Sequence, residues 1–325
     1  MDKHICAIIV TYEPHLPMLQ ELIRRIRQQV GAIVVVDNTC WQGSKTILAA
    51  IGDSAYLPMG SNRGVARAFN AGVEWAREQG CSHVLLMDQD SLPVNKMIQR
   101  LSAAEDSLLA DGCKVAAVGP TYSDPKFRVM RPFSRAEKWR VRRYQCEARD
   151  NDTFIPSDFL ISSGSLLRIS ALDAVGNFDE SFFIDYVDIE WGLRANSMGY
   201  GSYGVCGAGL EHSLAEDAIT FWFLKTWSVP IHEPIRHYYF FRNAILLYRR
   251  AYISRVWKLR ELSMLVLKAV FFSTVPAPRS ERLRMIVLGL YHGLCNRSGP
   301  FRRGSADEPS DTTDKRPGPV RPGLR

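Results

Sequence analysis

Apolar positions in the first part of the chain follow two different periods. Continuous apolar runs, which are typical of buried strands, lie at 5–10, 32–36, 84–87 and 115–118, and the first two are rich in Ile and Val. Segments in which apolar residues recur at helical spacing lie between them, at 19–26, 65–76 and 97–109. Strands that alternate with helices predict an α/β fold of Rossmann-like type, with a mostly parallel central sheet and flanking helices.

The pattern becomes less regular after this alternation. Residues 121–157 are basic, aromatic and irregular. The stretch "FLISSGSLLRISAL" at 159–172 then predicts a strand, a Gly turn, a second strand and the start of a helix. A further helix is predicted over 185–197.

The C-terminal part of the chain has a different character again. Helical spacing with many aromatic and basic residues fills 236–295, whereas the last residues are rich in Pro, Gly, Ser and charge. We therefore expect an α/β domain over 1–235, a helical extension over 236–297 and a disordered tail over 298–325.

The composition is that of an ordinary globular protein, and the cysteines carry no metal or redox motif. The seven cysteines form no CxxC pair, and an odd, scattered set fits buried thiols in a reducing compartment. The N-terminal segment has no signal-peptide cleavage pattern, and no stretch reaches the roughly 18 apolar residues of a spanning helix. These features predict a cytoplasmic protein.

Charge is concentrated in two basic segments. The net charge is +7, with +7 in residues 126–149 and +12 in residues 236–303, which leaves −12 for the rest. A mildly acidic body with two basic segments favours anionic ligands or an anionic surface met at particular places, rather than uniform binding to nucleic acid.

Polar residues follow three of the predicted strands where each strand meets its loop. They are Thr11 in "VTYEP", Asp37 and Asn38 in "VVDN", and Asp88 and Asp90 in "MDQD". The carboxyl ends of parallel strands share one edge, where ligands bind. Two acids so close together repel unless a cation neutralises them, and Mg²⁺ or Mn²⁺ takes one or two carboxylates plus substrate phosphates. The alternative is that these are ordinary polar loop residues.

Eight stretches in order make the chain resemble a known enzyme family. They are "AIIVTYEP", "VVVDN", "GSNRGVARAFNAGV", "LLMDQDS", "FLISSGSLL", "GNFDESFFIDYVDIEWGLRA", "LEHSL" and "YYFFRN", and they span roughly residues 5–245. The chain resembles the inverting glycosyltransferases of family 2, which have the GT-A fold, and within them the bacterial L-rhamnosyltransferases. The resemblance assigns residues 1–235 to the glycosyltransferase domain.

The resemblance implies a set of residues that bind the nucleotide-sugar. They are Thr11, Tyr12, Asp37, Asn38, Asn62, Arg63, Gly64, Asn70, Asp88, Gln89, Arg242 and Asn243. Asp37 would accept a hydrogen bond from the base, and the Arg242 guanidinium would match the diphosphate. Without the resemblance, "NRG" is a loop before a helix and Arg242 is one arginine on an amphipathic helix.

The resemblance also implies a metal site and a catalytic base. Asp88, Asp90 and His212 would hold Mg²⁺ or Mn²⁺, although Ala215 stands where the family often has Gly. On its own, His212 is more simply a core or surface histidine.

Three acids compete as the base that deprotonates the acceptor: Asp185, Asp188 and Glu190. Alignment from "LRA" places Asp188 at the catalytic position. Asp185 would share its helix face as a supporting or acceptor-binding residue. Ser163 and Gly164 would lie near donor and acceptor, unless "SSG" is only a tight turn that needs Gly164.

The basic C-terminal region raises the question of a membrane. Residues 262–275 are strongly apolar apart from Lys268, and such a helix either lies at a membrane interface or packs in a core or dimer. The first alternative predicts peripheral attachment to the inner face of the cell membrane.

The leading function is transfer of L-rhamnose from dTDP-L-rhamnose to a sugar hydroxyl of a lipid-linked or surface polysaccharide acceptor of O-antigen type. Alternatives are rhamnolipid synthesis and the same fold with another nucleotide-sugar. A non-catalytic nucleic-acid-binding protein is disfavoured by the ordered acids and His212, and we expect no nucleic-acid partner. No G-x-G-x-x-G follows the first strand, which argues against a dinucleotide-dependent oxidoreductase.

Overall fold

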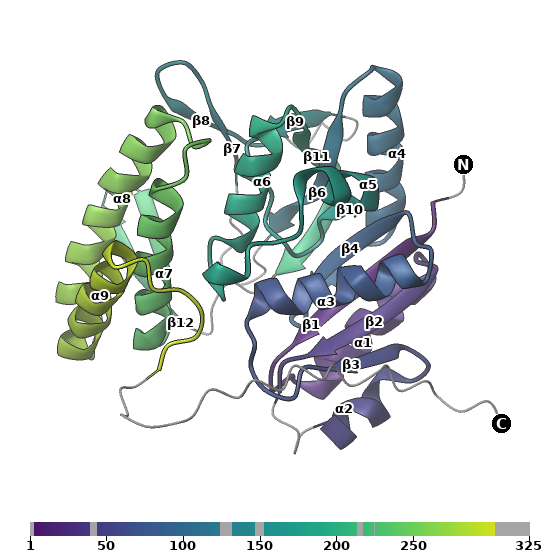
Figure 1. Ribbon diagram of the computed structural model, residues 1–325, viewed down its shortest axis with the longest axis horizontal. Coiled ribbons are helices and arrows are strands. Elements are labelled where there is room, and N and C mark those ends of the chain that lie inside the picture. The colour runs from purple at the N-terminus through teal and green to yellow at the C-terminus, as the bar shows by residue number, and fades with distance from the viewer. Residues whose placement is uncertain are drawn as a thin grey trace.

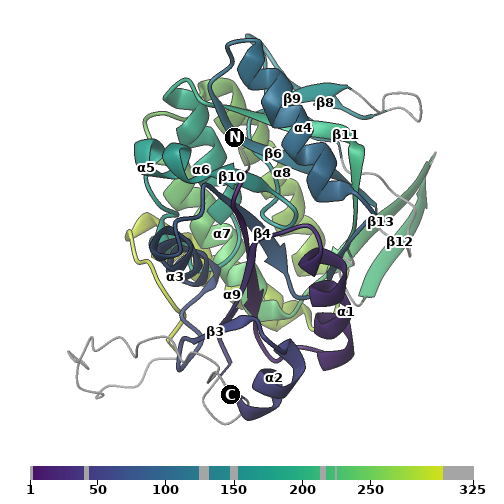
Figure 2. The ribbon, with the colours of Figure 1, turned by 90° about the vertical axis from the view of Figure 1, so that its right-hand side faces the viewer.

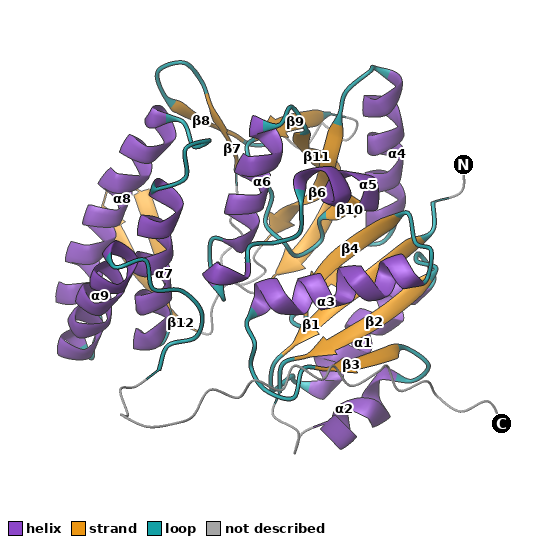
Figure 3. Cartoon of the chain, viewed as in Figure 1, coloured by secondary structure: helices purple, strands orange, loops and turns teal. Residues whose placement is uncertain are grey.

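The computed structural model describes residues 3–39, 44–123, 132–146, 153–212, 217–223 and 225–302 (Figures 1 and 3). The strands in these ranges are β1 (Ile5–Thr11), β2 (Ala32–Asp37), β3 (Ala55–Pro58), β4 (His83–Asp88), β5 (Ser91–Pro93), β6 (Val115–Ser123), β7 (Phe133–Ala136), β8 (Val141–Tyr144), β9 (Phe154–Ser157), β10 (Leu166–Arg168), β11 (Gly201–His212), β12 (Asp217–Phe223) and β13 (Lys225–Ile231). The helices are α1 (Leu16–Arg27), α2 (Ser44–Ile51), α3 (Val65–Glu78), α4 (Met97–Ala110), α5 (Ile169–Val175), the 3-10 helix η2 (Glu180–Phe182), α6 (Val187–Ser197), α7 (Pro234–Tyr248), α8 (Arg255–Thr274) and α9 (Arg279–Leu294).

The central sheet has the strand order β3-β2-β1-β4-β10-β6-β11-β5, and β9 pairs with β11. Strands β3, β2, β1 and β4 are parallel, and so are β6 and β11, whereas β10 runs antiparallel to both β4 and β6. The two parallel groups therefore point the same way, and their carboxyl ends meet at one edge of the sheet. The predicted mostly parallel sheet is confirmed.

Each central strand is buried on both faces, which explains the continuous apolar runs. Along β1, Ile8 and Val10 belong to the cluster that includes α3 and α6, whereas Ala7 and Ile9 belong to the cluster that includes α1 and α4. Figure 2 shows α3 on one side of the strands and α1 on the other.

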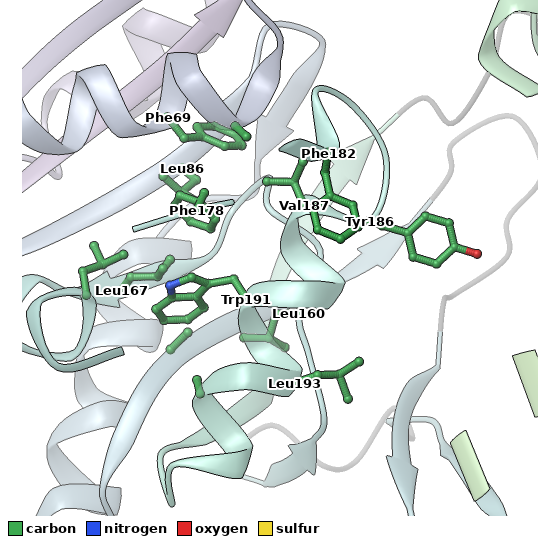
Figure 4. Packing of buried hydrophobic residues seen from close by; sticks show 14 of the residues in the cluster. Phe69, Leu86, Leu160, Leu167, Phe178, Phe182, Tyr186, Val187, Trp191 and Leu193 are labelled. Atoms are coloured by element: carbon green, nitrogen blue, oxygen red, sulfur yellow. The ribbon is translucent and has the colours of Figure 1, made fainter. Parts of the chain in front are cut away.

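Large aromatic side chains fill the space between α3, α6 and the sheet (Figure 4). The ring of Phe178 lies 5.6 Å from that of Phe69 on α3 and 5.6 Å from that of Trp191 on α6, measured between centroids. Phe182 and Tyr186 belong to the same buried cluster. This packing fixes the segment that leads into α6 against α3.

Two predicted elements differ in the structure. Residues 159–161 form no strand, because the carbonyl of Ile161 accepts hydrogen bonds from the side chains of Tyr122 and Ser165 instead of from a strand neighbour. The helix predicted from residue 185 begins at Val187, because the residues before it have positive φ. Residues 121–157 are also less irregular than predicted, since β6 extends to Ser123 and β7, β8 and β9 follow.

The expectation of free thiols throughout was wrong. Cys146 and Cys206 form a disulfide, with Cα atoms 5.4 Å apart, and this bond joins the segment after β8 to β11. Cys6 and Cys81 are free and buried, whereas Cys295 is free and exposed. Disulfides are rare in reducing compartments. The cysteines therefore no longer support a cytoplasmic location, which stays a prediction.

Helices α7, α8 and α9 lie together at one side of the molecule (Figure 1). Phe241, Ala244 and Leu247 of α7 belong to the same apolar cluster as α3 and α6, so α7 packs into the main core. The predicted boundary after residue 235 stays a prediction, and the predicted tail lies outside the described residues from 303 onward. Among the described helices, none has both the length and the apolar character needed to cross a membrane.

Candidate active site

The carboxyl ends of β1, β2, β4 and β11 come together at one edge of the sheet. Thr11 is the register partner of Asp37, and Val10 is the partner of Asp88. At the end of β11, the backbone of His212 pairs with that of Ser91, the residue after Asp90. The structure thus brings the backbones of the three predicted metal-binding residues to one edge, while the side chain of His212 lies outside the description.

Asp37 is buried at this edge, and its carboxylate orientation is fixed by three hydrogen bonds. Oδ1 accepts from the hydroxyl of Thr11 and from the backbone N–H of Thr39, both at 2.9 Å. Oδ2 accepts from the hydroxyl of Tyr56 on β3 at 2.7 Å. Sequence reasoning missed Tyr56, because no motif marks a tyrosine inside a short strand.

Tyr12 and Gln89 join the ends of β1 and β4 at the surface. The Gln89 side chain accepts from the backbone N–H of Tyr12 at 2.8 Å and donates to its carbonyl at 3.1 Å. The Tyr12 side chain is 47% exposed. The two predicted donor-binding residues therefore hold each other, and the aromatic ring of Tyr12 is accessible to a ligand.

The loop before α3 links the strand ends to a second part of the site. Asn38 accepts from the backbone N–H of Arg63 at 3.2 Å, and Asn62 accepts from that of Gly64 at 3.1 Å. Gly64 has a φ of 87°, and a Cβ there would lie 2.6 Å from the carbonyl oxygen of Phe183. Only glycine therefore lets this loop approach so closely.

We call residues 181–188 the acid loop, because they carry Asp185 and Asp188. Phe183, Asp185 and Tyr186 all have positive φ, of 58°, 61° and 64°. Non-glycine residues rarely adopt this conformation, and it persists only where surrounding contacts enforce it.

Asp188 connects the acid loop to the "SSG" segment. Its Oδ2 accepts from the backbone N–H of Ser162 at 3.0 Å. The hydroxyl of Ser163 in turn accepts from the backbone N–H of Asp88 at 3.1 Å and donates to Ser91 at 2.8 Å. The two neighbouring serines, Ser162 and Ser163, therefore join Asp188 to the end of β4.

Gly164 supports the tight-turn interpretation of this segment. Its φ is 79°, and a Cβ would lie 2.7 Å from Pro120. The side chain of Ser163 is fully buried. Both residues position the segment between Asp88 and Asp188, and neither presents a side chain to an open surface.

Asp188 and Glu190 lie in different surroundings. Burial raises the pKa of Asp188, against the opposing effect of backbone hydrogen bonds from Ser162 and Ile189, and the charge of Asp185 raises it further. Glu190 is buried in an ion pair with Arg194 at 2.8 Å. Of the three competing acids, Glu190 is therefore excluded as a base by its contacts.

The predicted contact of Arg242 and Asn243 with the diphosphate does not fit the structure. Both side chains are fully buried. Asn243 Nδ2 donates to the carbonyls of Phe182 and Ile184 at 2.7 Å and of Asp185 at 3.0 Å. Arg242 donates to Asn243, to the carbonyl of Gly299 and to carbonyls of the acid loop. These residues hold the acid loop in its strained conformation instead.

Asn70 also makes hydrogen bonds within the protein. Its Nδ2 donates to the carbonyl of Phe178 at 2.9 Å and to Glu180 at 3.0 Å, and its Oδ1 accepts from the backbone N–H of Phe178 at 2.9 Å. All of these bonds tie α3 to the segment before the acid loop. The side chain therefore has a structural task, and its predicted part in binding the nucleotide-sugar stays a prediction.

Arg236 on the first turns of α7 belongs to the site, although sequence reasoning did not single it out. Its guanidinium forms an ion pair with Asp185, with Nη2 3.0 Å from Oδ1 and Nε 3.2 Å from Oδ2. The charges of Asp185, Asp88 and Asp90 all raise the pKa of Arg236. In the sequence it is one of many basic residues after 235, and only the fold reveals its acidic neighbours.

A comparison with known proteins now decides the family. The model of glycosyl transferase family 2 matches residues 6–176. The chain is also 30% identical over 302 residues to the dTDP-rhamnosyl transferase RfbF of Shigella flexneri, which covers 93% of this chain and 99% of that protein.

The chain belongs to glycosyl transferase family 2.

It is therefore a glycosyltransferase, as predicted. Two relatives from Mycobacterium tuberculosis match less of the chain. The galactofuranosyltransferase GlfT1 is 27% identical over 213 residues, covering 63% of this chain and 68% of that protein. The N-acetylglucosaminyl-diphospho-decaprenol L-rhamnosyltransferase is 24% identical over 240 residues, covering 66% of this chain and 78% of that protein.

Solved structures of glycosyltransferases share the fold. GalNAc-T7 with UDP, GalNAc and Mn²⁺ has a TM-score of 0.52 at 11% identity, over 80% of this chain and 54% of that one. Staphylococcus aureus TarS 1–349 has a TM-score of 0.52 at 13% identity, over 90% of this chain and 81% of that one. The predicted GT-A-type fold is confirmed.

Proposed function

We propose that this glycosyltransferase transfers L-rhamnose, with inversion, from dTDP-L-rhamnose to a sugar hydroxyl. The observation that carries the proposal is the similarity to a dTDP-rhamnosyl transferase along almost the whole chain, 93% of it. The strand-end edge, defined as Thr11, Tyr12, Asp37, Asp88 and Asp90, then binds the donor, and the acid loop serves the acceptor.

Donor binding uses the accessible residues of the edge. The exposed ring of Tyr12 stacks on the nucleotide base. Asp37 is buried and accepts from Thr11, Thr39 and Tyr56, so it holds the strand end beneath the base, and its predicted contact with the base N–H stays a prediction. Asn62 and Arg63 are exposed on the loop that opens α3, where backbone amides and the helix N-terminus favour the diphosphate.

Transfer is a displacement at the anomeric carbon. The acceptor oxygen forms a bond to that carbon, the bond from the carbon to the β-phosphate oxygen breaks, and its electron pair stays on the departing diphosphate. Asp188 accepts the proton of the acceptor hydroxyl, and burial keeps its pKa raised toward the range useful for a general base.

The donor set at the end of β4 suits a divalent cation. Asp88 and Asp90 offer carboxylate oxygens, the ligand class that Mg²⁺ and Mn²⁺ prefer, and His212 lies on the paired strand. Within the described residues no group of three candidate side chains is close enough to hold a metal, and the His212 side chain is not among those described. Asp88 and Asp90 would hold the cation, which would supply positive charge to the leaving diphosphate.

A donor panel tests the function. The purified chain is incubated with Mg²⁺ and dTDP-L-rhamnose, UDP-glucose, UDP-galactose or GDP-mannose, and release of the nucleoside diphosphate is measured. Turnover of dTDP-L-rhamnose should exceed that of each other donor by about 10-fold or more. It should disappear with a chelator or in Asp90→Asn, and persist in Asp111→Asn, which changes an exposed aspartate after α4. A clear preference for another donor contradicts the proposal.

The acceptor that we propose is a lipid-linked saccharide at the inner membrane surface, as in O-antigen synthesis. Helices α8 and α9 expose large apolar side chains on their outer faces, among them Leu262, Val266, Leu267, Val270 and Val287. These residues leave the core interpretation of 262–275 incomplete, since only Leu265 and Phe272 of that segment are buried large hydrophobics.

The same two helices carry seven Lys/Arg and two Glu between residues 255 and 294. Apolar side chains surrounded by positive charge match an anionic bilayer surface. We therefore assign this surface, defined as the outer faces of α8 and α9, to peripheral attachment to the membrane.

Flotation with vesicles tests the attachment. The full chain should float with vesicles that contain phosphatidylglycerol, and the double variant Leu267→Glu/Val270→Glu should not. Leu48→Glu, which adds a charge at an exposed leucine of α2, is the matched control and should float like the wild type. If the wild type fails to float, the proposed membrane attachment is overturned. If the double variant has half the molecular mass of the wild type in solution, the surface serves self-association instead.

Two alternatives keep the fold and the site. In the first the acceptor is a lipid, so that the product is a rhamnolipid; transfer to a hydroxylated fatty acid but not to a saccharide would favour it. In the second the donor is another nucleotide-sugar, which the donor panel detects. Membership of an enzyme family removes the reading as a non-catalytic nucleic-acid binder.

A further inference from the structure

Arg236 is the cation that stands among the acids of the site. Two of its nitrogens contact the Asp185 carboxylate, at 3.0 and 3.2 Å. Its side chain is 43% exposed, whereas that of Asp185 is 19% exposed. The ion pair is therefore partly exposed, and the larger exposed part lies on the arginine side.

The carboxylates at the end of β4 also interact electrostatically with this guanidinium. The charges of Asp88 and Asp90 act on Arg236 in addition to that of Asp185. The geometry agrees, because the acid loop that Arg236 contacts is joined through Ser162 and Ser163 to the end of β4. Arg236 is therefore within electrostatic reach of the diphosphate of a donor held at Asp88 and Asp90.

A second arginine of α7 shows what a purely structural arginine looks like here. Arg242 is fully buried, and its hydrogen bonds go to Asn243 and to backbone carbonyls. Arg236 makes its described hydrogen bonds to a carboxylate, a group whose negative charge a phosphate can replace. A guanidinium bound to a carboxylate can exchange it for a phosphate, because the two groups offer similar pairs of oxygens.

We propose that Arg236 binds the diphosphate of the nucleotide-sugar, and that it exchanges its ion pair with Asp185 for the β-phosphate when the donor binds. This inference rests on the proposed function, since it concerns the same donor. When the bond between the anomeric carbon and the β-phosphate oxygen breaks, the electron pair stays on that oxygen and the N–H groups of Arg236 donate to it. Release from Arg236 also leaves Asp185 free to accept a hydrogen bond from the acceptor.

A comparison of nucleoside diphosphate and monophosphate isolates this role. Binding of dTDP and of dTMP to the full chain with Mg²⁺ is measured by calorimetry. Arg236→Met should lower the affinity for dTDP by about 10- to 100-fold, the range for one charge-assisted contact, and change that for dTMP by less than about 2-fold. Arg236→Lys should lie between Met and the wild type.

Arg250→Met is the matched control. Arg250 also pairs with an aspartate, Asp179, at 2.5 Å, and the side-chain exposures of 39% and 27% resemble those of the Arg236–Asp185 pair. This variant removes an equivalent ion pair near the opposite end of α7, and it should bind both nucleotides like the wild type.

Asp185→Asn gives a result that a structural ion pair cannot give. Because Asp185 competes with the diphosphate for the same guanidinium, its neutralisation should raise the affinity for dTDP by a few-fold and leave that for dTMP unchanged. Asparagine tolerates the positive φ of this position, so the loop should keep its conformation. Lower affinity for dTDP in this variant contradicts the exchange.

The two levels of proposal fail in different ways. If the wild type prefers dTDP to dTMP but Arg236→Met does so equally, or loses both nucleotides alike, the role of Arg236 is overturned and the function stands. If the wild type binds UDP rather than dTDP, dTDP-L-rhamnose is overturned as the donor. The same comparison with UDP and UMP then tests whether Arg236 binds the diphosphate. If it binds no nucleoside diphosphate, both are overturned.

Discussion

Asp37 and Asp88 are held by the register of neighbouring parallel strands, whereas Asp185 and Asp188 are held by a loop with three left-handed residues. The first pair needs only the hydrogen bonds of the sheet to reach its place. The second depends on Asn243, which lies more than fifty residues later in the chain and donates to three carbonyls of the loop.

The difference separates two ways of building one site. The strand-end edge is positioned by the most regular part of the fold, and its outer residues, such as Tyr12, stay accessible. The acid loop is positioned by buried polar contacts that must all be made together, because a partly satisfied buried network is costly. We therefore expect substitutions at the edge to change binding, and substitutions at Asp188 or at the buried contacts of the loop to change turnover or folding.

The largest effect is expected for Asp188→Asn. Loss of the base should lower kcat by about 1,000-fold, within the range known for general-base catalysis. The measurement is rhamnose transfer under saturating donor, with Asp173→Asn as a control at an exposed aspartate of α5. A kcat within a few-fold of the wild type would mean that another residue is the base. It would also contradict the assignment of catalysis to the acid loop and of donor binding to the edge.

Asn243→Ala should give the next largest effect. It leaves three carbonyls of the acid loop without their amide donor, and about 3 kcal/mol of unfolding free energy should be lost. Urea unfolding measures this change. Asn196→Ala, which removes one 3.2 Å bond from an exposed asparagine of α6, should cost less than about 1 kcal/mol. Equal costs for the two variants would show that the loop does not depend on its buried contacts.

The pH dependence of kcat/KM should report the raised pKa of Asp188. Because burial raises its pKa, activity should be lost as the pH falls through a value above the usual 3.9 or so of an aspartate. The nearby charge of Asp185 also raises this pKa, so Asp185→Asn should move the acidic limb to lower pH. A limb that moves upward, or that shifts equally in Asp173→Asn, contradicts this assignment.

The smallest effect is expected for Gln89→Ala at the strand-end edge. The change removes two hydrogen bonds to the backbone of Tyr12, at a partly exposed position. Affinity for dTDP should fall by about 3- to 10-fold, and the unfolding free energy should change by less than about 1 kcal/mol. Calorimetry and urea unfolding measure the two quantities. A large loss of unfolding free energy with unchanged affinity for dTDP would contradict the expectation that Gln89 serves binding rather than stability.

The parts of the site that could be predicted from the sequence are those fixed by periodic structure. Apolar runs predict strands, and polar residues directly after them fall at one edge because parallel strands end together. Asp37 and Asp88 were found in this way. The motif around Asp188 added the acid loop, although its left-handed backbone has no signature in residues such as Phe183 and Tyr186.

The rest depends on contacts between segments far apart in the chain. Arg242 and Arg236 lie on the same helix, and the sequence favoured the first because a motif contains it. Their roles differ because one side chain turns into the core under the acid loop and the other reaches Asp185. No local pattern distinguishes these directions, since helix α7 is covered on several faces by the sheet domain and by α9.

The most direct test of the division between edge and loop is a comparison of donor binding in Asp90→Asn and Asp188→Asn. Both variants are titrated with dTDP in the presence of Mg²⁺, beside the wild type. We expect Asp90→Asn to bind at least about 10-fold more weakly, and Asp188→Asn to bind like the wild type while it fails to transfer rhamnose. Equal loss of binding in both variants, or normal binding in Asp90→Asn, would contradict the assignment of the donor to the strand-end edge.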